Sequence, residues 1–188
     1  KEGKVFFHKS YGYHTYSKKR QVKNTDIYDL ASITKIAATI PMLMQMSEEG
    51  DFSLNYKMGK LDKSLYTTNK GHLRVKEVLA HQSALQAWIP FYRQTIDEDN
   101  SLRDTLYSNS YSAKYPIKVA EDLYLHHSYP DSILQQVIES DLLEEKEYKY
   151  SDLGYFLFKE IIEKHYNKSL EKLVNENFYQ SLGLSTMC

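Results

Sequence analysis

The stretch Asp29–Thr39, DLASITKIAAT, places a serine and a lysine three residues apart at the start of an apolar segment. From there apolar residues recur at the spacing of one helix face, and Gly50 follows an acidic end as a stop signal. These residues are Ile33, Ile36, Ala37, Ile40, Leu43, Met44 and Met46. The pattern predicts a buried helix with methionines in the core. Pro41 lies inside it and removes a backbone hydrogen bond, so we expect a kink there or a shortened first segment.

Ser32 and Lys35 have the spacing of a nucleophile and its activating amine. A serine hydroxyl is a weak nucleophile at neutral pH, and residues three apart share one helix face, so the lysine can reach it. At a first helical turn, free backbone N–H groups can also stabilise an oxyanion. The spacing alone is weak evidence, because Ser169 and Lys172 repeat it. The structural alternative for either pair is a helix-capping serine followed by a surface lysine.

The composition is that of a globular domain. The chain has 188 residues, enough for one ordinary domain, and its 24 basic and 25 acidic residues leave a net charge of -1. Such a balance provides no field to attract nucleic acid or an anionic membrane, so we expect neither partner. No apolar run has the length of a membrane span, and the first residues lack the features of a signal peptide. Cys188 is the only cysteine, which excludes an internal disulfide and a thiolate zinc cluster.

The rest of the chain divides into strand-like, loop-like and helical parts. Residues 4–32 are rich in aromatic and β-branched residues and predict strands, with a hairpin leading into the first helix. Residues 73–85 predict a short helix, with His81 in a structural role near its end. Residues 88–130 are polar and irregular and predict a long loop or lid. After residue 153 two amphipathic helices follow. Strands followed by a block of helices indicate an α+β domain or a piece of one.

Four segments resemble one protein family, in the family's order. Residues 29–54 resemble the first motif region of the penicillin-binding-protein and class C β-lactamase-like serine hydrolases, which carry Ser-x-x-Lys at the start of a buried helix. Residues 73–85 are similar to the segment that usually ends in His-x-Ser-Gly-Leu, with Ala84 in place of the glycine. Residues 148–174 are similar to the second motif, Tyr-x-Asn before an apolar helix. Residues 178–187 resemble the segment that closes the helical region.

By this resemblance Ser32 is the nucleophile, and Tyr150 is the general base or proton shuttle. A literal Tyr-x-Asn begins at Tyr107, but polar loop follows it, whereas an apolar helix follows Tyr150. A phenol titrates near pH ~10 and needs a cation beside it to ionise at neutral pH, a part that Lys35 can take. Asp152 stands where the family has asparagine, and a carboxylate only accepts hydrogen bonds. Paired with Lys35, it would hold the lysine protonated and favour the tyrosine as base.

The same resemblance implies where substrate would lie and which parts of the fold to expect. Asp152 and Trp88 are candidate substrate-binding residues, the tryptophan because it lies in the predicted lid. The family's third motif, Lys-Ser/Thr-Gly or His-x-Gly on an edge strand, has no counterpart; the nearest triplet, at residues 57–59, is in the wrong place. We therefore predict a single β-lactamase-like domain over residues 1–188 that lacks the C-terminal sheet strands. The expected fold is α+β, with N-terminal strands of an antiparallel sheet and a mostly helical region.

The implied function is that of a serine hydrolase forming an acyl-enzyme with an ester, amide, peptide or β-lactam. Its substrate would be a small molecule or peptide, and it would need no cofactor or metal. The resemblance places the protein outside the cytoplasm, in the periplasm or at the cell surface, as part of a longer multidomain chain. The segments also resemble β-lactamase-like domains appended to family 3 glycoside hydrolases in bacterial surface enzymes.

Two alternatives belong to other functional classes. A catalytically silent binding or scaffolding domain of a larger cell-wall-related enzyme is favoured by Asp152, Ala84 and the missing third motif, and opposed by the intact Ser32, Lys35 and Tyr150. A metallohydrolase would draw on the seven histidines. None of them, including His126, His127 and His165, has the spacing of a metal motif, so we expect structural or surface roles for them.

Overall fold

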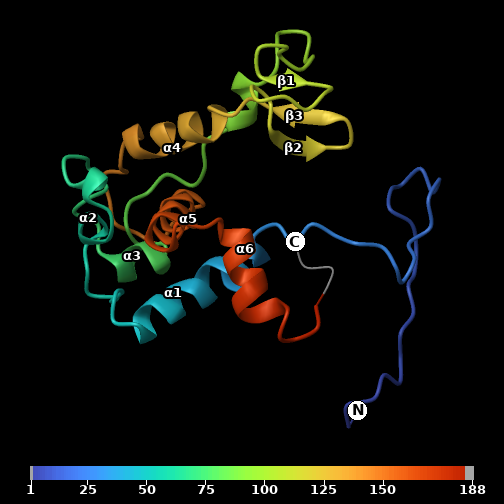
Figure 1. Cartoon of the computed structure of the whole chain (residues 1–188), viewed down its shortest axis with the longest axis horizontal. Coiled ribbons are helices and arrows are strands. Elements are labelled where there is room, and N and C mark those ends of the chain that lie inside the picture. Colours follow the sequence, from blue (N-terminus) through green and yellow to red (C-terminus); the bar gives the residue numbers. More distant parts are fainter. Residues whose placement is uncertain (1, 185–188) are drawn as a thin grey trace. The chain divides into compact units, whose positions relative to one another are not determined.

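The computed structural model describes residues 2–184, and its contacts separate the chain into two units, Lys1–Thr34 and Lys35–Cys188. The second unit is a cluster of helices with a small sheet (Figure 1). Its longer helices are α1 (Ile40–Glu48), α4 (Tyr129–Glu139) and α5 (Leu153–Tyr166). Its shorter helical segments are η1 (Lys35–Thr39), α2 (Met58–Leu61), η2 (Lys63–Leu65), α3 (Val75–Leu79), η3 (Phe91–Gln94), α6 (Leu170–Val174) and η4 (Asn175–Tyr179). Within residues 2–184, no helix combines the length and apolar character needed to cross a membrane.

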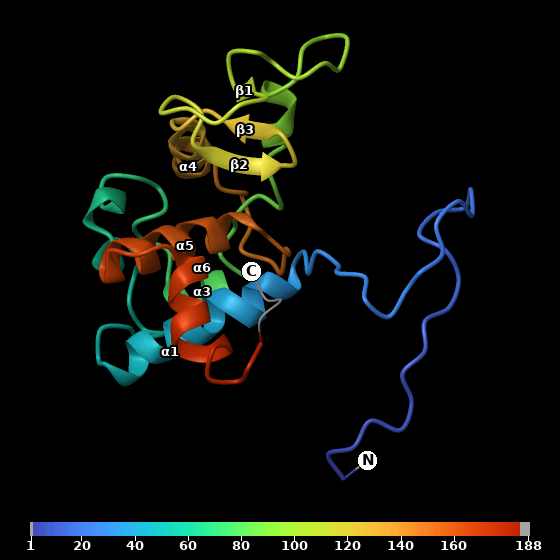
Figure 2. The same cartoon turned by 45° about the vertical axis from the view of Figure 1, so that its right-hand side comes forward.

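Helix α5 is the centre of the second unit and packs against η1, α3, α4 and α6. Both views show it among the other helices (Figure 1, Figure 2). Its predicted apolar stripe is buried at Leu153, Leu157, Ile161 and Ile162. The fifth predicted member, Phe156, is only partly buried, whereas Phe158 is buried. Gly154 allows α3 to approach closely, because a Cβ atom there would lie 2.4 Å from a methyl group of Val78. The helix ends at Asn167, whose left-handed backbone (φ 51°) is typical of a helix C-terminus.

The predicted first helix is present but begins irregularly. Residues Lys35–Thr39 form a π-helical turn, and the regular helix α1 begins at Ile40, immediately before Pro41. The helical run itself begins earlier, at Ile33, so the irregularity before the proline is a π-helical turn and not the expected shortened segment. The carbonyl of Ala37, which lies four residues before the proline and therefore cannot receive its missing N–H, accepts a hydrogen bond from the Tyr179 hydroxyl.

Only one side of this helix is buried. Met42, Leu43 and Met46 are at most 2% exposed and belong to the core. Ile36 and Met44, which were expected in the core, are both 67% exposed. The reason is that the buried stripe is narrow. It is filled by Met42, Leu43 and Met46, which are spaced one, three and four residues apart, so the two exposed side chains lie outside it.

A three-stranded antiparallel sheet lies where a loop was expected. Its strands are β1 (Tyr107–Ser108), β2 (Ile117–Ala120) and β3 (Leu123–Leu125), in the order β1-β3-β2. Both views place it beside the start of α4 (Figure 1, Figure 2). The strands are short, and most of their residues are half-buried without alternating between two faces, so they lack the apolar alternation by which a sequence shows a strand. The predicted fold class, a partial α+β fold, is confirmed, although the strands come from a different part of the chain.

The first unit does not contain the predicted strands. Within residues 2–34 the ladder is limited to one antiparallel bridge, between Tyr13 and Gln21. Composition suggested strands, but a strand needs partners for its backbone groups, and Val5 and Phe6 are 82% and 84% exposed.

Asp26 holds the loop around that bridge together. Its carboxylate accepts hydrogen bonds from the Lys23 backbone N–H at 2.7 Å and from Arg20 at 3.0 Å, and it pairs with His14 at 2.7 Å. The hydrogen bond from the Lys23 backbone lowers the pKa of Asp26 most, and His14 and Arg20 add to this effect, to about 2. The aspartate therefore stays ionised at any pH at which the protein is studied.

Candidate active site

Lys35 is the centre of the candidate site in the second unit. Its Nζ donates a hydrogen bond to Asp152 Oδ1 at 2.5 Å, and the two side chains are 14% and 42% exposed. Burial lowers the pKa of the amine, but hydrogen bonds with Asp152 and Tyr150 outweigh it, and the pKa is raised above its usual value. A lysine in this environment is a fixed cation at neutral pH.

Two tyrosine rings lie next to this cation. The Lys35 Nζ is 5.0 Å from the ring centroid of Tyr150 and 5.5 Å from that of Tyr155, within the range of a cation–π contact. Tyr150 is 43% exposed, so its phenol is accessible from solvent. The structure thus brings together Lys35, Tyr150 and Asp152, which are far apart in the sequence.

Backbone pairing fixes the position of Tyr150. Residues 149–152 run beside residues 81–87, and the Asp152 N–H donates to the Ala87 carbonyl at 2.9 Å. The Ser151 hydroxyl donates to the Gln86 carbonyl at 2.6 Å. Asp152 then occupies the N-cap position of α5, yet its side chain accepts no capping hydrogen bond. Its carboxylate is directed to Lys35 instead, which explains how the start of an apolar helix contributes to a polar site.

The segment beside Tyr150 contains two left-handed residues. His81 (φ 57°) follows helix α3, and Ala84 (φ 60°) stands where the resembling family has glycine. Because glycine adopts this conformation without steric cost, the alanine at this position carries strain of about 1–2 kcal/mol. Ala84 therefore keeps the left-handed backbone conformation that glycine adopts easily at this turn.

Ser32 belongs to the first unit. It lies in a turn one residue before the helical residue Ile33, is exposed, and follows Ala31, which has a left-handed backbone (φ 45°). The Asp29 carboxylate accepts the Ala31 N–H at 2.7 Å and shapes this turn. Along the chain Ser32 stands three residues before Lys35, the first residue of the second unit.

The whole chain can now be compared with known proteins. Residues 1–187 match the model of the Beta-lactamase family. The chain belongs to this family. Protein flp of Staphylococcus aureus (strain NCTC 8325 / PS 47) is 26% identical over an alignment of 188 positions, which covers 98% of this chain and 32% of flp. The chain therefore spans about a third of the length of this curated relative.

Solved structures show the same fold. FmtA from Staphylococcus aureus matches with a TM-score of 0.62 at 19% identity, over 93% of this chain and 40% of FmtA. A class C β-lactamase from Rhodobacter sphaeroides matches with a TM-score of 0.56 at 18% identity, over 92% of this chain and 40% of that enzyme. At these identities the similarity shows a shared fold.

The two duplicate motifs of this β-lactamase-family chain have different surroundings. Ser169 is the N-cap of α6 and accepts the Lys172 N–H at 3.4 Å, while the Lys172 side chain is 63% exposed. This pair is the capping serine and surface lysine of the structural alternative. Tyr107 lies in strand β1 and is paired with Leu125. The two pairs that share a spacing thus differ in the burial of their lysines, 14% exposed for Lys35 against 63% for Lys172.

Trp88 directly follows Ala87, whose carbonyl accepts the Asp152 N–H, and its side chain is 56% exposed. It therefore stands one residue beyond the paired segment that holds Tyr150.

The histidines expected to be structural include His165, which pairs with Asp51 at 3.6 Å and with Glu49 at 4.0 Å. These three side chains offer ligand atoms within 4.8 Å of one another, beside a hollow of about 460 Å³, a grouping that sequence spacing did not indicate.

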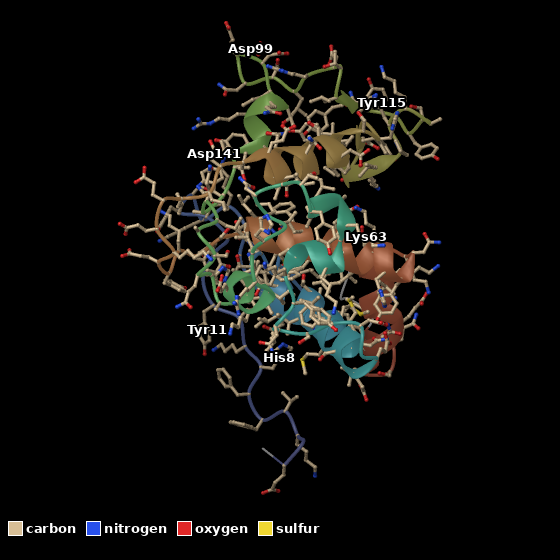
Figure 3. All side chains as sticks on the ribbon, turned by 90° about the vertical axis from the view of Figure 1, so that its left-hand side faces the viewer. His8, Tyr11, Lys63, Asp99, Tyr115 and Asp141 are labelled. Atoms are coloured by element: carbon tan, nitrogen blue, oxygen red, sulfur yellow. The ribbon has the colours of Figure 1, made fainter. Side chains whose placement is uncertain are left out.

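A second buried amine, Lys70, was also not singled out from the sequence. It is fully buried, and its Nζ donates to Asn69 at 2.8 Å and to the carbonyl of Ser140, the residue after α4. Burial lowers the pKa of Lys70 to about 8, although the charge of Asp141 opposes this shift. Figure 3 shows Asp141 at this end of α4. The Lys70 amine anchors the start of the segment that runs from Ser140 to Tyr150. Nothing in the sequence around Lys70 distinguishes it from an exposed lysine.

Proposed function

We propose that this chain carries the acylating residues of a serine hydrolase of the β-lactamase and penicillin-binding-protein type. The observation that supports this most is the buried Lys35 amine, held between the Asp152 carboxylate and the Tyr150 phenol. In this proposal Ser32 is the nucleophile and Tyr150 the general base. The substrate is an ester, amide, peptide or β-lactam, Asp152 and Trp88 contact it, and the domain works outside the cytoplasm within a longer chain.

The proposed reaction follows from the charges at the site. The Lys35 cation favours the phenolate form of a neighbouring phenol, which accepts the proton of the Ser32 hydroxyl as its oxygen attacks the substrate carbonyl carbon. The tetrahedral oxyanion collapses, and the leaving group takes the proton from Tyr150. Water then attacks the acyl-serine ester and gives a proton to the tyrosine. The second tetrahedral intermediate releases the acid product as the Ser32 oxygen takes that proton back, which regenerates the serine and the phenolate. Lys35 stays protonated throughout because Asp152 holds it so.

We expect a fluorophosphonate to add one covalent group to the chain, and a penicillin to do so if β-lactams are substrates. Intact-mass measurement detects the adduct, which forms as the Ser32 oxygen displaces fluoride or opens the lactam ring. Ser32→Ala should abolish it. Ser169→Ala removes the other serine with the same spacing and should leave it unchanged, which makes it the matched control.

The same experiment separates the second candidate function, a silent binding domain. That candidate is favoured by the carboxylate at Asp152 and by the strained Ala84. An adduct that persists in Ser32→Ala would place the nucleophile elsewhere. A wild-type chain that stays unmodified by both probes would favour the silent domain.

We expect Asp152→Asn to lower the pKa of Lys35, because the neutral amide removes the main interaction that raises it and leaves the effect of burial. A larger fraction of the amine is then unprotonated at alkaline pH and reacts with acetic anhydride. Peptide mass analysis at pH 9 should show faster acetylation of Lys35 in the variant than in the wild type. Lys172 in the same samples is the internal control and should react equally in both. Equal acetylation of Lys35 would contradict the role given to Asp152.

A further inference from the structure

His81 holds the residues on both sides of Tyr150. Its backbone carbonyl accepts the Lys149 N–H at 2.8 Å, and its ring Nδ1 accepts the Ser151 N–H at 3.1 Å. Its left-handed backbone (φ 57°) turns the chain after helix α3 so that both acceptors face the same segment. Expected from the sequence to be a structural helix-end residue, His81 does donate its backbone N–H to the Val78 carbonyl in the last turn of α3, and it also contacts the proposed catalytic tyrosine directly.

The imidazole ring also packs against the phenol rings around the site. Its centroid lies 4.5 Å from that of Tyr150, with a tilt of 38°. It lies 5.8 Å from Tyr155, which is nearly parallel to it, and 6.3 Å from Tyr148, which is edge-on. Tyr150 is therefore positioned by the Lys35 cation and by this imidazole.

The hydrogen bond to Ser151 requires a neutral imidazole. Because Nδ1 accepts this hydrogen bond, the proton of the neutral ring is on Nε2. A second proton would bind to Nδ1, and two donors would then face each other, which breaks the hydrogen bond with the Ser151 N–H. The groups facing the ring are the Lys35 cation, the Asp152 carboxylate and the three phenols. Burial lowers the pKa of His81, and the Lys35 charge lowers it further against the opposite effect of Asp152. The neutral form of His81 is thus favoured at physiological pH, and the ring becomes protonated in acid.

We propose that His81 is the positioning residue for Tyr150, whose neutral ring holds the phenol beside Lys35 and whose protonation releases it, so that the site is switched off in acid. The catalytic consequence rests on the proposed function, while the positioning itself does not. His81 acts through Tyr150 and takes no part in bond making.

Asparagine at this position separates positioning from titration. Asn tolerates a left-handed backbone, and its side-chain oxygen can accept the Ser151 N–H as Nδ1 does, but it does not titrate. Alanine removes the acceptor and the ring. At pH 7.5 we expect the rate at which a saturating fluorophosphonate phosphonylates Ser32 to fall by less than about tenfold in His81→Asn and by about a hundredfold or more in His81→Ala.

The acid side of the pH profile is the decisive kinetic readout. In the wild type two protonations, of His81 and of Tyr150, stop acylation, so the logarithm of the rate should fall with a limiting slope of two in acid. In His81→Asn one protonation remains, and the slope should be one. A slope of two that persists in His81→Asn, or a His81→Ala rate equal to that of the wild type, would overturn the proposal.

An NMR titration tests the positioning without any substrate. The intact chain is labelled with ¹³C at His and Tyr, and the Tyr150 ring signal is assigned as the one that is missing in Tyr150→Phe. Between pH 8 and 5 this signal should change with the same midpoint as the His81 signal. In His81→Asn the change at that midpoint should be absent, and only protonation of the phenol itself should move the signal. A Tyr150 signal that ignores the His81 titration would refute the positioning. A chain that shows the NMR coupling but no acylation would overturn the proposed function alone.

Discussion

Lys35→Met is expected to slow acylation of Ser32 by about 10²–10⁴-fold, the range typical of losing a group that assists proton transfer. Methionine has a similar length and fills the same space, but it removes the cation that stands 2.5 Å from Asp152 and 5.0 Å from the Tyr150 ring. Without that charge the phenol loses the cation that favours its ionised form at neutral pH. The measurement is the rate of adduct formation with a fluorophosphonate, followed by intact mass.

Lys172→Met is the matched control for this prediction. Lys172 has the same spacing from a serine but is 63% exposed, so the rate should be unchanged. Circular dichroism should show both variants folded, because Asp152 is 42% exposed and water can solvate it once its partner is gone. A Lys35→Met rate within tenfold of the wild type would remove the lysine from the mechanism.

Phe158→Ala is expected to lower the free energy of unfolding by about 3–5 kcal/mol, the cost of removing a large aromatic side chain from a core. Phe158 is fully buried in α5. Its ring meets Phe52 edge-on at 6.5 Å and Tyr155 at 6.0 Å. The cavity would border Tyr155, whose ring also contacts Lys35. Urea unfolding at pH 7 gives the change, with the denaturant dependence showing whether the transition stays two-state.

Phe156→Ala provides the comparison on the same helix. Phe156 is partly buried and packs against Phe91 at 5.5 Å, so its removal leaves a space that solvent partly fills. Its loss should therefore destabilise the protein less than that of Phe158. If the two variants were equally stable, the core would not be centred on Phe158.

Local patterns in the sequence were enough for several elements. The apolar stripe of α5 was predicted because its spacing repeats over several turns, and the fold class followed from the family resemblance. Pro41 correctly indicated an irregular helix, since the missing N–H is a property of the residue itself, although the irregularity is a π-helical turn and not a shortened segment. The same local chemistry explains Ser169, whose side chain caps the helix it precedes.

The positions of the strands could not be obtained in this way. Residues 4–32 have the composition of strands, but within the described part of the chain they form a single antiparallel bridge. Residues Ile117–Ala120 form a strand although their sequence shows almost no alternation of apolar and polar residues. Strand formation depends on a partner for the backbone, and a partner is not a property of the strand's own residues. Composition therefore predicted strands in the wrong segment.

The sequence by itself determined the candidates Ser32, Lys35, Tyr150 and Asp152, because the motif spacing and the helices that follow are local. Only the tertiary structure decided that Lys35, and not Lys172, is the buried cation, and that His81 contacts Tyr150. Burial and charge pairing depend on which distant segments pack together. The pairing of residues 81–87 with residues 149–152 creates this environment, and no spacing along the chain encodes it.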